Sequence, residues 1–188
     1  MKILVVNNHT QHLQYLTAAL AGHELDIVVY EPGVILDESG ADLVVLSGGG
    51  GEGLEINDSH QSGKLWYQDE MEFIMRCSKP IIGICMGFEV IARAYGSKVE
   101  EMSSLIMGFR KLTTTKGGKT AFSKESLRQY EAHQWHVEDI NTKEFDVLAH
   151  SASGLEIIKH KRRPVLATQF HPEKGGTLKL KHLLSSAF

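Results

Sequence analysis

One of the two cysteines stands where a thiol could act as a nucleophile. Cys85 lies between Gly83 and Gly87, after the apolar run of residues 80–84 and before a helical pattern over residues 88–94. This order of strand, turn and helix is that of a nucleophile elbow. Glycines beside the nucleophile relieve the Cβ clashes of so sharp a turn, and a helix N-terminus lowers the pKa of a thiol. We therefore predict that Cys85 is a nucleophile, with a buried structural cysteine as the alternative.

A base and a group to orient it follow late in the chain. Residues 165–168 form an apolar run, and His171, Pro172 and Glu173 come soon after it. Strand ends on one edge of an α/β sheet meet in space, so His171 can approach Cys85 despite their separation in sequence. The intervening proline lets Glu173 fold back to the other imidazole nitrogen, where it would fix the tautomer and stabilise the imidazolium. The pattern predicts a triad of these three side chains, with a turn histidine as the alternative.

The elements that must position this triad begin with short apolar runs in the first half of the chain. They lie at residues 3–6, 26–30, 43–46 and 81–84, and residues 11–21 and 67–77 between them have helical patterns. Such runs are typical of strands that are covered on both faces. The alternation predicts an α/β fold, doubly wound, with a mostly parallel central sheet flanked by helices.

The C-terminal half favours an additional antiparallel portion. Strands are expected at residues 108–115 and 120–122, joined by a hairpin turn at 116–119, and further strands at 146–149, 155–160 and 165–169. A closing helix is expected at residues 178–185. No internal repeat or linker interrupts the pattern, so we expect a single domain over residues 1–188.

Composition argues against several classes of protein. The 188 residues carry a formal net charge of -3, which gives no reason to expect binding to nucleic acid or to a membrane. The basic turn at residues 161–163 is interpreted as a solvated face. Two cysteines are too few for a disulfide framework, and Cys77 falls late in a helical pattern, as a packing residue would. The first apolar run is too short for a signal peptide, so a reduced, cytoplasmic protein is expected.

Three motifs together resemble the class I, or triad-type, glutamine amidotransferase family. They are Leu-Ser-Gly-Gly at residues 46–49, Gly-Ile-Cys-Met-Gly at 83–87 and Gln-Phe-His-Pro-Glu at 169–173, and the resemblance covers essentially the whole chain. It implies that Cys85 attacks the side-chain amide of glutamine to give a γ-glutamyl thioester and ammonia, with His171 as acid and base and Glu173 holding it. It also implies an oxyanion hole from Met86 and Gly49, and no cofactor is expected.

The chain departs from this family at positions that concern the substrate. Glu89 stands where the family usually has a glutamine that holds the amino-acid end of the substrate, and Phe88 replaces a smaller residue or histidine. A carboxylate at residue 89 can accept a hydrogen bond from an α-ammonium group but would repel an α-carboxylate. Gly108 and Phe109 resemble the family's second glutamine-holding segment. Residues 50–53 replace the usual proline-containing loop.

Within the family, the likeness is greatest to the group that contains the glutaminase part of GMP synthase. Residues 130–133 are similar to a segment that faces the synthetase in that group, although the acidic residue expected soon after it is missing. No ATP-pyrophosphatase domain follows, so the resemblance implies that the synthase is a separate subunit. The alternative interpretation of His133 and His136 is a solvated loop with a stacking Trp135.

Other functions remain as alternatives. The chain could be a stand-alone γ-glutamyl hydrolase or transferase that acts on a different γ-glutamyl substrate, as Glu89 suggests, or a non-catalytic regulatory domain of the same fold. Phosphate binding by the glycine loop is disfavoured because no Gly-Lys-Ser/Thr follows it. A metal site is not expected, since the i, i+3 pairs His9/His12 and His133/His136 lack an accompanying ligand set.

Overall fold

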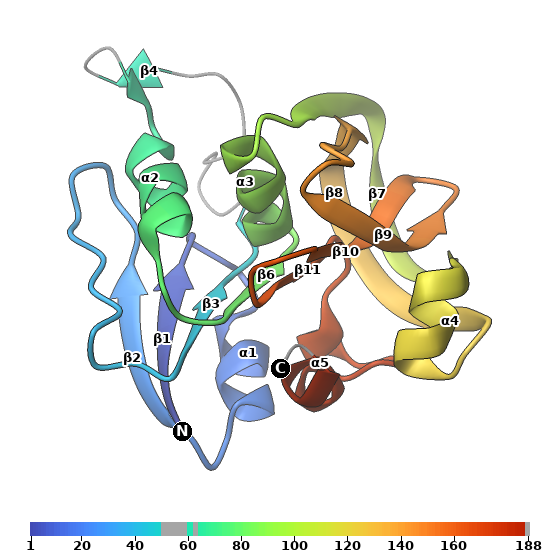
Figure 1. Ribbon diagram of the computed structural model, residues 1–188, viewed down its shortest axis with the longest axis horizontal. Coiled ribbons are helices and arrows are strands. Elements are labelled where there is room, and N and C mark those ends of the chain that lie inside the picture. The colour runs from blue at the N-terminus through green and yellow to red at the C-terminus, as the bar shows by residue number, and fades with distance from the viewer. Residues whose placement is uncertain (50–59, 62–63, 187–188) are drawn as a thin grey trace.

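The computed structural model describes residues 1–49, 60–61 and 64–186, so the glycine-rich loop at 50–53 lies outside the described residues. Among these residues, nine strands form one sheet in the order β2-β1-β3-β6-β11-β10-β9-β7-β8 (Figure 1). A separate two-stranded ribbon joins β4 (His60–Gln61) to β5 (Lys64–Leu65). The first five strands of the large sheet are parallel and the rest antiparallel, which confirms the expected fold class.

The parallel half of the sheet matches the sequence prediction closely. Its strands are β1 (Lys2–Asn7), β2 (Glu24–Val29), β3 (Leu43–Leu46), β6 (Ile81–Ile84) and β11 (Val165–Thr168). The three central strands β3, β6 and β11 are buried at every residue, as expected of strands covered on both faces. The expectation of burial is wrong for β2, where Ile27 is 40% and Val29 48% exposed, because β2 is the edge strand of the sheet.

Helices cover both faces of this parallel half. On one face, α2 (Gln68–Arg76) and α3 (Met86–Ala94) contribute Phe73 and Ile91 to a core beneath them. On the other face, α1 (Leu13–Ala19) and α5 (Leu180–Ser186) contribute Leu16 and Leu183 to a second core. Figure 1 shows the two pairs of helices on opposite sides of the sheet. The doubly wound arrangement is therefore confirmed.

The antiparallel half is dominated by one long hairpin. It consists of β7 (Lys98–Thr114) and β8 (Ser126–Asp139), and β9 (Phe145–Ser151) and β10 (Gly154–His160) connect it to β11. The expected strands at 146–149 and 155–160 are confirmed, but β8 was not predicted as a strand. It lies at the second edge of the sheet.

The hairpin turn predicted at residues 116–119, and the strand predicted at 120–122, are wrong. These residues form α4 (Lys116–Phe122), which begins after Thr115, whose hydroxyl accepts a hydrogen bond of 3.2 Å from the amide of Gly118. This N-cap contact outweighs the turn preference of the two glycines. A Cβ atom at Gly118 would lie 1.9 Å from the carbonyl oxygen of Leu148, so the glycine is needed for α4 to pack on β9.

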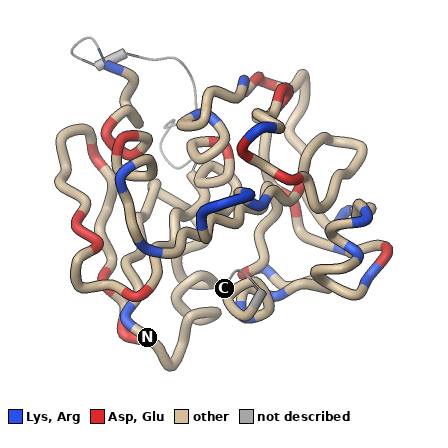
Figure 2. Tube along the Cα trace, viewed as in Figure 1, with Lys and Arg blue, Asp and Glu red and all other residues tan. Residues whose placement is uncertain are grey.

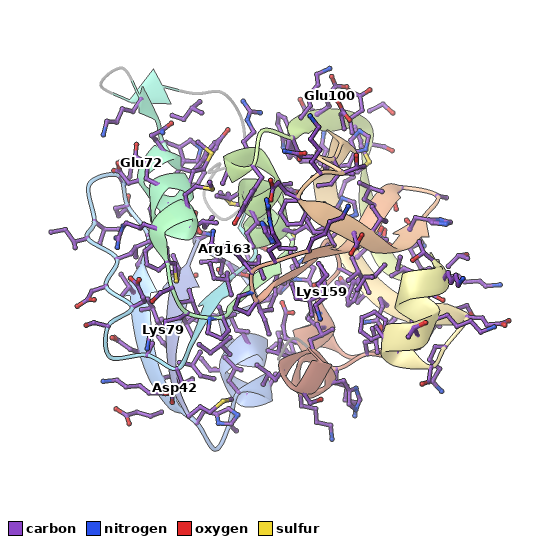
Figure 3. All side chains as sticks on the ribbon, in the orientation of Figure 1. Asp42, Glu72, Lys79, Glu100, Lys159 and Arg163 are labelled. Carbon is purple, nitrogen blue, oxygen red and sulfur yellow. The ribbon has the colours of Figure 1, made fainter. Side chains whose placement is uncertain are left out.

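The two arginines of the basic turn after β10 form hydrogen bonds within the molecule. Arg162 donates two hydrogen bonds of 2.9 Å to Glu144, and Arg163 donates to the carbonyl oxygens of Ile74 and Cys77 at the end of α2. Figure 2 shows basic and acidic residues mixed along the trace, and Figure 3 shows Arg163 in the middle of the molecule beside α2. Arg163 thus ties α2 to the turn before β11, whereas Arg162, whose side chain is 73% exposed, lies on a solvated face as predicted.

Within the described residues, every helix is too short or too polar to cross a membrane.

Candidate active site

Cys85 occupies a strained turn between β6 and α3. Its backbone angles are φ 51° and ψ −107°, a combination that a residue with a Cβ rarely adopts. A Cβ at Gly83 would lie 2.7 Å from the carbonyl oxygen of Gly87, and one at Gly87 would lie 2.6 Å from that of Leu46. Both glycines are therefore required by close packing of α3 on the sheet, and the predicted elbow is confirmed.

The thiol of Cys85 is buried and held in its neutral form. The side chain is 6% exposed, and Sγ donates a hydrogen bond of 3.7 Å to the carbonyl oxygen of Ala132 on β8. Burial raises the pKa of Cys85 well above its ordinary value, and the charges of Glu89 and Glu173 raise it further. The amide of Met86 lowers the pKa, but by less, so the lowering predicted from the start of the helix is outweighed by burial.

His171 and Glu173 form the predicted pair. Nδ1 of His171 lies 2.8 Å from Oε1 of Glu173, and both side chains are almost fully buried. With Glu173 ionised, Nδ1 carries the proton and Nε2 bears the lone pair of a base. Nε2 is buried without a hydrogen-bond partner among the described residues, so it is available to a reacting group. The backbone amide of His171 donates to the carbonyl oxygen of Tyr130, which fixes the segment against β8.

The glycine loop after β3 is the point where the cysteine and the histidine meet. A Cβ at Gly48 would lie 3.0 Å from Cε1 of His171 and 3.5 Å from Cβ of Cys85, so both side chains contact this glycine. Cys85 and His171 also line one cavity of about 280 Å³. The lining is completed by Gln11, His12, Gly49, Met86, Glu89, Leu105, Met107, Tyr130, Ala132, His133, Gln134 and Trp135.

The two residues expected to form an oxyanion hole lie together on the cavity wall. A Cβ at Gly49 would lie 2.1 Å from Sδ and 3.1 Å from Cβ of Met86, so a larger residue there would displace the Met86 side chain. The carbonyl oxygen of Ser47 accepts a hydrogen bond of 3.1 Å from the amide of Gly87, which fixes the loop on the start of α3. The amide of Met86 interacts with the thiol of Cys85. Gly49 and Met86 thus lie side by side on the cavity lining, and their role as an oxyanion hole stays a prediction.

Glu89 lies on the wall of the same cavity, one helical turn from Cys85. It is 3% exposed, and its Oε1 accepts a hydrogen bond of 2.7 Å from Nε2 of Gln169. Burial raises the pKa of Glu89 to about 7, although the hydrogen bond from Gln169 and the charge of His133 act in the opposite direction. Glu89 is thus poised to gain or lose a proton near neutral pH.

Gly108 and Phe109 lie beside the cavity and are not among the residues that line it. Leu105 and Met107 of the same strand, β7, supply that part of the wall. Phe109 is 39% exposed and packs edge-on against Tyr130, with ring centroids 5.6 Å apart. The predicted segment is therefore adjacent to the cavity, but its contact residues are offset from those predicted.

Two histidines of the cavity wall could not be assigned from sequence. His12, which directly precedes α1, meets the ring of His171 edge-on at 4.9 Å between centroids, and burial together with the neighbouring His171 lowers its pKa. His133 is 5% exposed within β8, so the interpretation of this residue as part of a solvated loop is wrong. The inward-facing residues of β8 include Gln129, Glu131 and His133, so no alternation of apolar and polar residues marked this strand in the sequence.

Comparison with known proteins agrees with this geometry. The family model for class I glutamine amidotransferases matches residues 4–188. A curated subunit of the glutamine-hydrolysing GMP synthase from Methanothermobacter thermautotrophicus is 32% identical over 176 residues, which cover 91% of this chain and 88% of the relative. The corresponding subunit from Methanocaldococcus jannaschii is 31% identical over 110 residues, and that match covers 57% of each chain.

The fold is also similar to that of solved structures. A crystal structure of a Thermoplasma acidophilum protein, described as belonging to a GMP synthase, is 28% identical and superposes with a TM-score of 0.74. The match covers 92% of this chain and 84% of that protein.

Proposed function

Because the chain belongs to the class I glutamine amidotransferase family and is a glutaminase enzyme, we propose that it supplies ammonia to a separate synthetase subunit. The observation that carries this proposal is the meeting of the Cys85 thiol and the His171–Glu173 pair around Gly48, in one cavity with amides on its wall.

The first half of the reaction follows from the protonation states. The raised pKa of Cys85 means that the resting thiol keeps its proton, and Nε2 of His171 is the free base nearby. Sγ attacks the side-chain carbonyl carbon of glutamine while its proton passes to Nε2. The resulting imidazolium is stabilised by Glu173 and gives a proton to the departing amide nitrogen, which leaves as ammonia.

The second half regenerates the enzyme. Nε2 of His171 takes a proton from a water molecule, whose oxygen attacks the carbonyl carbon of the thioester, and glutamate leaves as Sγ recovers a proton. In both halves the substrate oxygen becomes negative in the tetrahedral state. The amides of Met86 and Gly49 are the proposed donors to that oxygen.

The proposed recipient of the ammonia is the synthetase subunit of a GMP synthase with ATP-pyrophosphatase activity. The support is the likeness to curated GMP synthase subunits, three of which this chain matches over 89%, 88% and 95% of their length. Strand β8, which carries the segment at 130–133, forms one side of the cavity. We propose that the reaction takes place in the cytoplasm, since both Cys77 and Cys85 are free thiols.

The test is release of ammonia and glutamate from L-glutamine by the purified chain. Cys85→Ala should abolish release, whereas Cys77→Ala is the matched control, because Cys77 is buried away from the cavity and packs against the core. Addition of the synthetase subunit of a GMP synthase together with its substrates should increase the rate for the unmodified chain. Equal release by Cys85→Ala and the unmodified chain would refute the assignment of the nucleophile.

A second candidate function rests on Glu89. Its carboxyl group faces a cavity in which the family usually presents a neutral amide, so a γ-glutamyl compound without a free α-carboxylate could be the preferred substrate. A panel of γ-glutamyl amides and peptides, compared with free glutamine by kcat/KM, decides between the two. Preference for free glutamine over every panel member would contradict this second candidate.

A further inference from the structure

Three buried ionisable side chains meet at the β8 side of the cavity, and one of them, His133, lines it. Glu131 and His133 come from β8 and Glu156 from β10, and their exposed fractions are 0%, 5% and 0%. One nitrogen or oxygen atom from each lies within 4.8 Å of the others. Strands β8 and β10 are not neighbours in the sheet order, so this cluster links two strands that share no backbone ladder.

The hydrogen bond of one imidazole nitrogen determines what the other can do. Nδ1 of His133 lies 2.8 Å from the carbonyl oxygen of Trp135, which can only accept, so Nδ1 is a donor. A neutral His133 then points the lone pair of Nε2 at Oε2 of Glu131, 3.4 Å away. Two acceptors that face each other in a buried site repel unless a proton or a cation lies between them. The same Nδ1 contact to a carbonyl is the usual support of a metal-binding histidine.

The two carboxyl groups show the same incomplete pairing. Ser153 donates to Oε2 of Glu131 and Ser151 to Oε1 of Glu156, each at 2.7 Å, so each carboxyl is held by one hydroxyl. Oε1 of Glu131 and Oε2 of Glu156 are buried and have no hydrogen-bond partner within the described residues. Unpaired buried oxygens of this kind are costly, and a cation bound by both carboxyl groups would offset that cost.

We propose that Glu131, His133 and Glu156 bind a divalent transition metal ion, of which zinc is the best match. Two ligands of a tetrahedral zinc ion, each about 2.1 Å from the metal, lie about 3.4 Å apart, and this is the separation of the His133 and Glu131 atoms. An imidazole nitrogen in the set favours zinc, manganese or iron over magnesium or calcium. Two carboxylates, one neutral imidazole and one divalent ion also leave the buried site without net charge.

The ion would act on the shape of the cavity. His133 and its neighbours Tyr130, Ala132, Gln134 and Trp135 form one side of the cavity, and all lie on β8. A metal ion that joins β8 to Glu156 on β10 would hold this side in place. The role is structural, so the ion takes no part in the thioester chemistry proposed above, and this inference does not depend on the identity of the substrate.

The test uses the full chain with Cys85→Ala, so that the thiol of the active site cannot bind the added metal. After removal of metal by a chelator and dialysis, calorimetric titration with zinc should show one tight site per chain, and zinc should raise Tm. Glu131→Gln and Glu156→Gln should each weaken zinc binding at least 10-fold and reduce the rise in Tm.

The matched controls are exposed residues of the same types on the neighbouring surface. Glu138→Gln on β8 and His150→Gln on β9 should leave both the zinc affinity and the rise in Tm unchanged. Absence of a tight site, and of any rise in Tm with zinc, manganese or cobalt, would overturn the proposal and show that shared protons alone satisfy the cluster. Zinc binding that survives in Glu131→Gln and Glu156→Gln would overturn it equally. None of these measurements uses glutaminase activity, so their outcome is separate from the test of the proposed function.

Discussion

Replacement of Glu89 by glutamine should stabilise the protein above neutral pH. Glu89 is buried at 3% exposure, and the one hydrogen bond identified to its carboxyl comes from Nε2 of Gln169. A glutamine at residue 89 has nearly the same shape and keeps a carbonyl oxygen for that bond. The substitution therefore removes a buried ionisable group and preserves the packing around it.

The size of the effect follows from the pKa of Glu89, which is about 7 in the folded protein against an ordinary value of 4.5. The gap is worth about 3 kcal/mol, at about 1.4 kcal/mol per pKa unit. Between these two pH values the folded protein binds more protons at Glu89 than the unfolded chain does. The contribution of Glu89 to the free energy of unfolding therefore falls as pH rises from about 4.5 to 7, and it is constant above this range.

Urea unfolding of the two proteins, followed by circular dichroism, measures this difference. Glu89→Gln should exceed the unmodified chain in free energy of unfolding by about 3 kcal/mol at pH 8 and by about 1 kcal/mol at pH 5. Glu72→Gln on α2 is the control, because Glu72 is exposed on a helix and should show no such dependence on pH. A Glu89→Gln protein that is less stable at both pH values, or equally stabilised at both, would refute the reasoning.

Two further predictions test the triad and the corrected helix. Glu173→Gln should lower kcat for glutamine hydrolysis by about 10²-fold to 10⁴-fold with little change in KM, because His171 loses the carboxylate that holds Nδ1 at 2.8 Å. A steady-state assay in which kcat stays within a factor of three would contradict this role. Gly118→Ala should lower the free energy of unfolding by about 3 kcal/mol, since its Cβ would lie 1.9 Å from the carbonyl oxygen of Leu148. Gly117→Ala, whose nearest contact is a side-chain carbon at 3.3 Å, should be neutral or stabilising by up to about 1 kcal/mol in the same urea unfolding experiment.

The sequence predicted the parallel half of the fold and the triad because both depend on local patterns. Short apolar runs mark strands that are buried on both faces, and β3 and β6 match them residue for residue. The elbow was equally visible, since the close approach of α3 to the sheet leaves no space for a side chain at Gly83 or Gly87. In each case the structural requirement, burial of a strand or absence of a side chain, can be recognised from a few consecutive residues.

The features that the sequence did not reveal depend on contacts between distant segments. The glycines of α4 favour a turn locally, and the helix forms because Thr115 caps it and because it packs on β9. The edge position of β2 follows from the strand order, which its own residues do not encode. The partners of His133 were missed for the same reason, because Glu156 is brought to it only when β10 packs near β8.

The charges around the thiol of Cys85 affect the stage of the reaction at which it loses its proton. Burial opposes the thiolate of Cys85, and the carboxyl groups of Glu89 and Glu173 oppose it further, whereas the amide of Met86 is the stabilising contact. A free thiolate is therefore costly in the empty cavity, while transfer of the proton to Nε2 of His171 creates an imidazolium beside Glu173. Negative charge then moves from sulfur to the substrate oxygen, which the amides of the cavity wall can receive. Because burial disfavours the thiolate, we expect activation of the thiol to accompany the binding of a substrate carbonyl group.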